Sequence, residues 1–282
     1  MPAPTKSVAL ALAALIQPGA TPAEHGKHAA PAPHGAPRGA AQAEAYPPPP
    51  QPAQAHGVHW EYEGSAGPER WGDLSEEFKA CKVGHMQSPV DLGGADIKGS
   101  FTVRTAYKAG PLTILNNGHT VQATFPAGSV LSSGIARYKL LQVHFHTPSE
   151  ETIYGVPYPM VAHFVHVDHA GNLAVLGVLF EEGAFNPELD KLIKLAPRQQ
   201  TPAQTYDAVM FDPGKLLPSN LAVYRYEGSL TTPPCTEGVR WHVATHPVSA
   251  SAGQIAMLHA IMGDNARPTQ PLHGRLLVAG TD

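Results

Sequence analysis

Polar and apolar side chains alternate through Gln142-Val143-His144-Phe145-His146, and this short segment limits the folds open to the chain more than any other. Alternation with a period of two is typical of a β-strand, in which residues i and i+2 lie on the same face. We therefore expect a strand that presents Gln142, His144 and His146 together and turns Val143 and Phe145 to the opposite face.

A third histidine follows in a similar segment. Val161-Ala162-His163-Phe164-Val165 is also strand-like, and a neighbouring strand could bring His163 beside the first pair. Three histidine ligands leave a tetrahedral zinc ion one open position, which is the arrangement of a catalytic site. The spacing does not choose His163 over His166 or His169, although His166 would face away from His163 on the same strand.

Most of the remaining regular segments also predict strands. Residues 112–116, 120–125, 140–146, 160–167 and 173–180 are rich in β-branched and aromatic residues. Turn signals such as Asn117-Gly118 and Ser133-Gly134 separate these segments. Two short helices are expected, one after Asn186 and one over residues 251–262. The pattern predicts a sheet-dominated α+β domain with long loops.

The first 56 residues have a different composition. Lys6 precedes an apolar run over residues 8–16, and small residues follow it, which is the pattern of a secretory signal. Residues 17–56 contain ten Pro and twelve Ala but no Val, Ile, Leu, Phe or Trp. Such a stretch cannot bury enough apolar surface to fold. We expect a signal peptide at 1–20, a disordered Pro/Ala/His-rich linker at 21–56, one domain at 57–282, and a protein that is periplasmic or secreted.

The cysteine count and the charge add two constraints. In an exported protein, the pair Cys81 and Cys235 favours one disulfide, with two buried free thiols as the alternative. The net charge of −4 comes without a basic stripe, so no nucleic-acid partner is indicated. No apolar run after residue 16 approaches the length of a membrane span.

A set of motifs between His59 and about Arg275 resembles the α-carbonic anhydrase family in its bacterial form. In order, the motifs are HWEYEG, GPERW, QSPVDL, LNNGHT, QVHFHTPSEET, YPMVAHFVH, NLAVLGVLF, YEGSLTTPPCTEGVRW and NARPTQPLHGR. The resemblance implies a single domain on a large, twisted, mainly antiparallel sheet with short peripheral helices and a zinc ion at the bottom of a conical cleft. It implies reversible hydration of carbon dioxide to bicarbonate and a proton by zinc-bound hydroxide. Oligomeric state stays open, with a homodimer as one option.

The resemblance also assigns roles to individual residues. The zinc ligands are His144, His146 and His163. His119 matches the histidine that carries protons between zinc-bound water and solvent, and an imidazole with a pKa near 6.5 suits that task. Thr231 matches the hydroxyl that orients the hydroxide, Glu150 matches the carboxylate that orients Thr231, and Thr232 lines the same pocket.

Further positions match the surroundings of the metal. The apolar wall for carbon dioxide comprises Val165, Val175, Leu230, Val239 and Trp241. Tyr62 matches a polar residue of the water network, and Cys81 and Cys235 match the disulfide of bacterial members.

Two positions depart from the family pattern. The family usually has a carboxylate two residues before the third ligand, where this chain has Val161, and a histidine where it has Glu151. We hypothesise a swap, in which Glu151 supports the second ring nitrogen of His163, because a metal-ligating histidine rarely lacks such a partner. The alternative is an exposed Glu151. Gln142 is retained and should orient His144.

Three other functions remain open at this point. One alternative is a binding protein with the same fold but no catalysis. The absence of the usual carboxylate at Val161 leaves this alternative open. A metal carrier would use the tail residues His25, His28, His34 and His56, although a solvated spacer is the simpler interpretation of that tail. A zinc esterase would need a shaped substrate pocket, for which the sequence has no separate motif.

Overall fold

The computed structural model describes residues 58–95, 97–99 and 103–280. The expected signal peptide and linker, with the histidines of the tail, lie outside these residues. Within the described part of the chain, no helix has both the length and the apolar character needed to cross a membrane.

Strands dominate the described residues, as the sequence predicts. They are β1 (Ile97–Gly99), β2 (Val103–Ala106), β3 (Gly110–Asn116), β4 (Val121–Thr124), β5 (Val130–Ser133), β6 (Ala136–His146), β7 (Thr152–Ile153), β8 (Val156–Pro157), β9 (Met160–Val167), β10 (Leu173–Glu182), β11 (Thr201–Phe211), β12 (Val223–Ser229), β13 (Glu237–Ala244), β14 (Val248–Ala250) and β15 (Val278–Gly280). The bounds of β9 match the expected segment at both ends.

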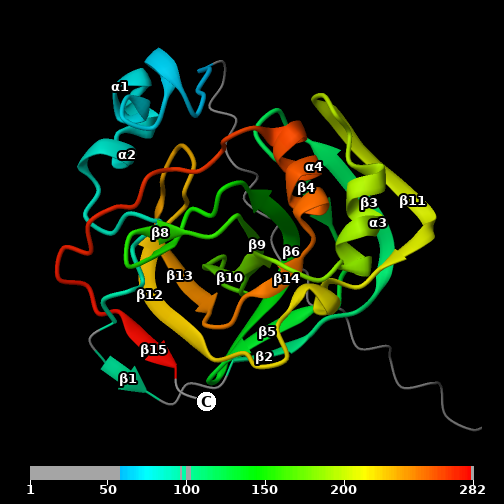
Figure 1. Ribbon diagram of the computed structural model, residues 1–282. Helices are drawn as coiled ribbons and strands as arrows, with labels where there is room; N and C mark the ends of the chain where they lie inside the picture. The colour runs from blue at the N-terminus through cyan, green and yellow to red at the C-terminus, as the bar shows by residue number, and fades with distance from the viewer. Residues whose placement is uncertain (1–57, 96, 100–102, 281–282) are drawn as a thin grey trace, which may run out of the picture. The chain divides into compact units, whose positions relative to one another are not determined.

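Thirteen of the described strands form one sheet, in the order β1-β15-β12-β13-β10-β9-β6-β4-β3-β11 with β14, β2 and β5 attached beside this path. Most neighbours are antiparallel, but β10 runs parallel to β13 and β14, and β1 runs parallel to β15. Figure 1 shows β6, β9 and β10 in the middle of the sheet and β11 at one side. The predicted large, mainly antiparallel sheet is confirmed.

The helices are short and peripheral. They are α1 (Trp71–Leu74), α2 (Ala80–Val83), α3 (Pro187–Leu195) and α4 (Ala252–Met262), with 3₁₀ turns at Gly64–Ala66, Glu76–Phe78 and Pro213–Leu216. The Asn186 side chain accepts from the first free backbone N–H groups of α3, and Ser251 forms a capping box with Gln254 at the start of α4. Both helices therefore begin where the sequence predicts.

The two faces of the sheet carry different residues, and β9 shows the division. Ala162 and Phe164 join the larger apolar cluster, together with core residues of α3 and α4. Val161 and Val165, on the other face, belong with a second apolar cluster that includes Trp241. The helices α3 and α4 thus cover the face opposite to the one that carries His163.

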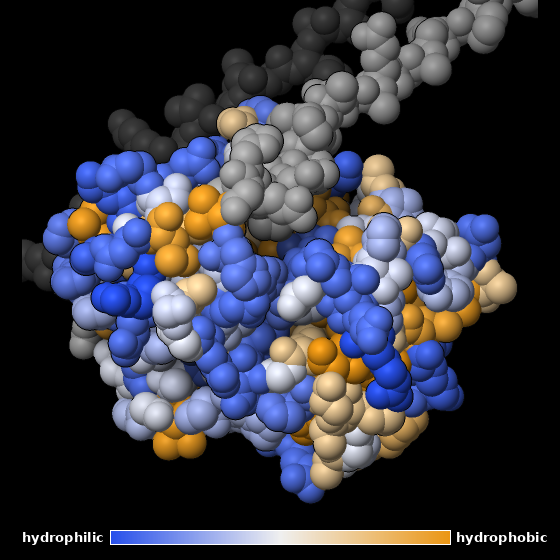
Figure 2. Space-filling view, turned by 90° about the horizontal axis from the view of Figure 1, so that it is seen from above, coloured by the Kyte–Doolittle hydropathy of each residue, from blue (hydrophilic) through white to orange (hydrophobic). Residues whose placement is uncertain are grey.

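The sequence analysis predicted β3, β4, β6, β9 and β10 but not the other ten described strands, of which β11, β12 and β13 are the longest. The side chains of β11 are mostly exposed, and Pro202 interrupts its pattern, so neither alternation nor an apolar run marks it. On the molecular face seen in Figure 2, hydrophilic residues separate apolar patches, which is ordinary for a protein surface.

Candidate metal centre

The pairing of β6 with β9 brings the three predicted ligands together. His144 lies directly opposite His163 in the register of these strands, and His146 is two residues further on the same face of β6. One nitrogen from each ring lies within 4.8 Å of the others. All three side chains line a cavity of about 650 Å³, so the expected convergence of His144, His146 and His163 is present.

Each of the three predicted ligand histidines has an acceptor for one of its ring nitrogens. Nδ1 of His144 is 2.9 Å from Oε1 of Gln142, as expected, and Nδ1 of His146 is 2.7 Å from the carbonyl oxygen of Asn265. Nε2 of His163 is 3.1 Å and 3.3 Å from the two carboxylate oxygens of Glu151. The nitrogens that remain for a metal ion are therefore Nε2 of His144, Nε2 of His146 and Nδ1 of His163.

Two buried atoms in this cluster lack a hydrogen-bond partner: Nε2 of His146 and Oε2 of Glu150. Burial and the neighbouring histidines lower the pKa of His144 and His146 well below the ordinary value, so both rings are neutral at pH 7. Neutral imidazole is the form that binds zinc, and three converging histidine nitrogens, of which His146 Nε2 is buried without a hydrogen-bond partner, match the ligand set of a catalytic zinc site. The residues present therefore fit the ion.

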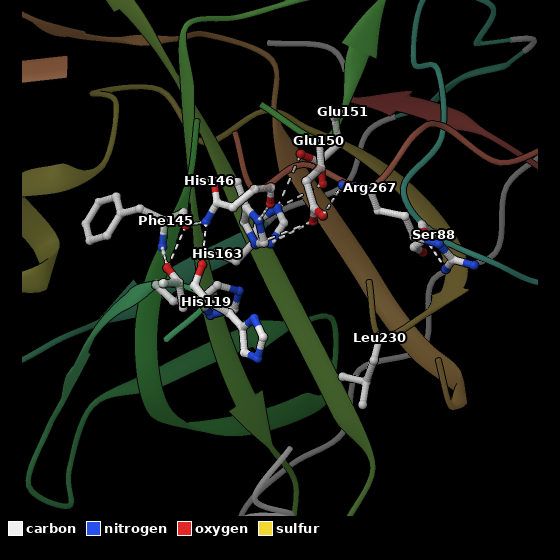
Figure 3. A network of polar contacts seen from close by, with 12 residues as sticks. Ser88, His119, Phe145, His146, Glu150, Glu151, His163, Leu230 and Arg267 are labelled. Atoms are coloured by element: carbon white, nitrogen blue, oxygen red, sulfur yellow. Dashed lines mark hydrogen bonds and ion pairs between the residues drawn. The ribbon is translucent and has the colours of Figure 1, made fainter. Parts of the chain in front are cut away.

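His163 differs from the other two rings in its electrostatics. Burial acts to lower its pKa, but the carboxylates of Glu151 and Glu150 outweigh burial, and the net pKa is raised. Its Nδ1 is 3.7 Å from Oε2 of Glu150, on the opposite side of the ring from Glu151. Figure 3 shows both carboxylates pointing toward the histidines.

Glu150 is a buried residue beside the three histidines, and its carboxyl group is held by a backbone contact. Its Oε1 accepts the backbone N–H of Arg267 at 2.9 Å. Burial raises the pKa of the Glu150 carboxyl to about 7; His163 opposes this, Glu151 adds to it, and the Arg267 N–H and the Thr231 hydroxyl oppose it further. A divalent cation nearby would favour the carboxylate. The Thr231 hydroxyl is thus close enough to Glu150 to act on its pKa, and the orienting role of this pair stays a prediction.

The Arg267 side chain connects this region to the disulfide. Its Nη1 donates to Oε1 of Gln87 and to the Ser88 carbonyl, and its Nη2 donates to the carbonyl of Cys81 at 3.0 Å. Cys81 and Cys235 are joined in the structure, as predicted. No role for Arg267 followed from the sequence, because a lone arginine carries no signal of its partners.

His119 lines the same cavity, at the turn between β3 and β4. Its ring stacks on Trp60 with centroids 3.7 Å apart and planes at 9°. Burial lowers its pKa; Glu61 opposes that effect, and His59 adds to it. The carbonyl of His119 accepts from Nδ2 of Asn265, whose own carbonyl holds His146.

The expected apolar wall is largely in place. Val165, Val175, Leu230 and Trp241 line the cavity together with Tyr62 and Thr232. Val239 is 1% exposed and packs in the same apolar cluster, but it is not one of the cavity-lining residues. Burial raises the pKa of Tyr62 well above its ordinary value, so its hydroxyl stays protonated.

The histidines that the spacing left open have other surroundings. His166 is completely buried, with its Nε2 2.8 Å from the Tyr107 hydroxyl and its Nδ1 3.3 Å from the Ala174 carbonyl. His169 is exposed after the end of β9. Of the three candidates for the third ligand, His163, His166 and His169, only His163 joins the cluster among the described residues.

Comparisons with known proteins agree with this geometry. Residues 66–281 match the family described as eukaryotic-type carbonic anhydrase. A carbonic anhydrase of Nostoc sp. is 40% identical over 232 residues, covering 80% of this chain and 88% of the relative. One of Klebsiella pneumoniae is 43% identical over 232 residues, covering 80% and 93%. The solved α-carbonic anhydrase of Thermovibrio ammonificans, in complex with the inhibitor sulfanilamide, is 46% identical, covers 79% of this chain and 99% of its own, and has a TM-score of 0.76.

Proposed function

The chain belongs to the eukaryotic-type carbonic anhydrase family, whose reaction is the reversible hydration of carbon dioxide, and we propose that it performs this reaction with a zinc ion held by His144, His146 and His163. The observation that carries the proposal is the convergence of three free ring nitrogens, each on a ring whose other nitrogen has an acceptor. Zinc bound in such a site lowers the pKa of a coordinated water to about 7, for which carbonic anhydrase is the established example.

Thr231 orients the attacking oxygen in this proposal. Its hydroxyl donates a hydrogen bond to Glu150, so the Thr231 oxygen is left to accept a hydrogen bond from the nucleophile. That contact selects a nucleophile that can donate a hydrogen bond, and it aims a lone pair at the substrate. The Arg267 N–H keeps Glu150 in place.

Carbon dioxide is nonpolar, so an apolar wall suffices to hold it. Val165, Val175, Leu230 and Trp241 supply this wall at the cavity surface. The same side chains exclude water from the side on which the substrate would rest.

His119 is proposed to carry the product proton out of the cavity. Its ring lines the cavity, and its pKa lies below the ordinary value for histidine because of burial. A weakly basic imidazole takes up a proton and releases it readily at neutral pH.

We also place the working protein outside the cytoplasm. The disulfide between Cys81 and Cys235 and the bacterial relatives support export, with residues 1–20 as the signal and 21–56 as the linker. The folded domain then begins near residue 57.

Stopped-flow hydration of carbon dioxide by the purified protein, with zinc counted per chain, tests the function. We expect one zinc per chain and rapid hydration, and His146→Ala should lose metal and activity together. His169→Ala, which changes an exposed histidine outside the cluster, should retain both. Hydration that persists in a zinc-free His146→Ala protein would refute the proposal.

A further inference from the structure

The three ligand histidines are supported by chemically different acceptors. His144 is held by the amide oxygen of Gln142 and His146 by a backbone carbonyl, whereas His163 is held by the carboxylate of Glu151. His163 is therefore the one ring in the cluster whose outer nitrogen meets a formal negative charge.

Glu151 is built into the interior. Its side chain is 0% exposed, and both of its oxygens reach Nε2 of His163. The Ser149 hydroxyl donates to the Glu151 carbonyl at 2.7 Å, which fixes the backbone of the segment that precedes β7. A fully buried carboxylate is costly unless it is paired, so this geometry is not that of a surface residue.

The strand of His163 offers no substitute for this carboxylate. Val161 lies two residues before His163 on the same face of β9, is 0% exposed and packs in the apolar cluster with Leu179 and Trp241. A hydrocarbon side chain cannot accept the ring N–H. The acceptor therefore comes from the segment 149–151 rather than from the strand itself.

The charges on the two sides of His163 add a second argument. Glu150 lies 3.7 Å from Nδ1 and Glu151 lies 3.1 Å from Nε2, so the His163 ring is placed between two buried carboxyl groups. Two buried carboxylates would repel each other, and a divalent cation held at Nδ1 would compensate this repulsion.

We propose that Glu151 is the positioning residue of His163 and that its carboxylate, replacing any acceptor at position 161, sets the affinity of the site for zinc. This inference rests on the proposed metal site but concerns affinity and ligand geometry rather than turnover. Outer partners of this kind typically contribute 10–100-fold to metal affinity.

The direct test measures zinc affinity of the metal-free protein by competition with a chromogenic chelator. Glu151→Ala should weaken zinc by about 10–100-fold, and Glu151→Gln, which keeps the shape and loses the charge, by about tenfold. Adding Val161→Glu to Glu151→Ala should recover part of the affinity, because it restores an acceptor on the same face of β9.

A spectroscopic readout separates positioning from a general loss of stability. The visible spectrum of the cobalt(II)-substituted protein reports ligand geometry, and it should shift in Glu151→Ala and return toward the parental spectrum in the double variant. Glu188→Gln is the matched control, since Glu188 is also buried but pairs with Lys191. It should bind zinc and cobalt like the parent.

The outcomes are distinct from those of the function test. If Glu151→Gln and Glu151→Ala bind zinc as tightly as the parent and give its cobalt spectrum, the inference is overturned even when the parent hydrates carbon dioxide. If Glu151→Ala fails to fold, Glu151→Gln decides alone. If the parent binds zinc but does not hydrate carbon dioxide, the proposed function is wrong, and the zinc affinities of the variants still test the role of Glu151.

Discussion

His242 is completely buried on β13, where its Nε2 lies 3.0 Å from the Ser133 hydroxyl. Burial lowers its pKa to about 3; Arg225, His166 and Arg240 act in the same direction, and a backbone contact with Val175 opposes them. The folded protein therefore holds this ring neutral, whereas the unfolded chain takes up a proton near pH 6.5.

The size of the resulting pH effect follows from these two values. Well above pH 6.5 the ring is neutral in both states, so His242 does not change the free energy of unfolding. Between pH 6.5 and the folded pKa near 3 only the unfolded chain is protonated, and the free energy of unfolding falls by about 1.4 kcal/mol for each pH unit. From pH 8 to pH 5.5 the loss is about 1.4 kcal/mol.

His242→Gln removes the titrating ring and keeps a polar group for Ser133. We expect the parent to lose about 1.4 kcal/mol more than this variant between pH 8 and pH 5.5. Urea unfolding at each pH, with zinc saturating, measures the difference, and contributions that both proteins share cancel. Ser133→Ala is the control, because it removes the hydrogen bond but leaves the ring, and it should keep the parental pH dependence. Equal losses in the parent and His242→Gln would show that the argument from burial is wrong.

Two further predictions follow from other parts of the site. His119→Ala should slow steady-state hydration while leaving the exchange of carbon dioxide with bicarbonate at equilibrium nearly intact, and imidazole buffer should restore part of the rate; equal losses in both assays without rescue would contradict the shuttle role. In the double variant Cys81→Ser/Cys235→Ser, the free energy of unfolding should fall by up to about 5 kcal/mol, because the disulfide joins residues 154 positions apart. An unchanged urea midpoint would contradict this contribution of the cross-link.

Local patterns predicted the central strands β3, β4, β6, β9 and β10. Alternation along β6 was sufficient to put His144 and His146 on one face, because the side-chain period of a strand is fixed by its backbone. The choice of His163 over His166 and His169 came from the family resemblance, and the register of β6 with β9 places it opposite His144. The helices α3 and α4 were equally accessible, since Asn186 and Ser251 cap them with side chains that the sequence shows directly.

Contacts made by backbone groups could not be predicted from local sequence patterns. His146 is held by the carbonyl of Asn265, 119 residues away, and every residue carries a carbonyl. The stacking of Trp60 on His119 also joins distant segments, and the motif that contains Trp60 does not name its partner. The Glu151 contact was anticipated only as a hypothesis, because it depends on how the loop between β6 and β7 turns inward.

The bond between Cys81 and Cys235 closes a covalent ring that contains His119, the three ligand histidines and Thr231. If the protein is exported, as proposed above, it meets proteases, which cut first at exposed turns. Ile135, in the turn between β5 and β6, is fully exposed and lies inside this ring. A cut there divides the backbone but leaves both fragments joined through sulfur, so the two pieces cannot diffuse apart until a reductant opens the ring. The cross-link therefore gives the domain a tolerance of nicking that an uncross-linked chain with the same fold would lack.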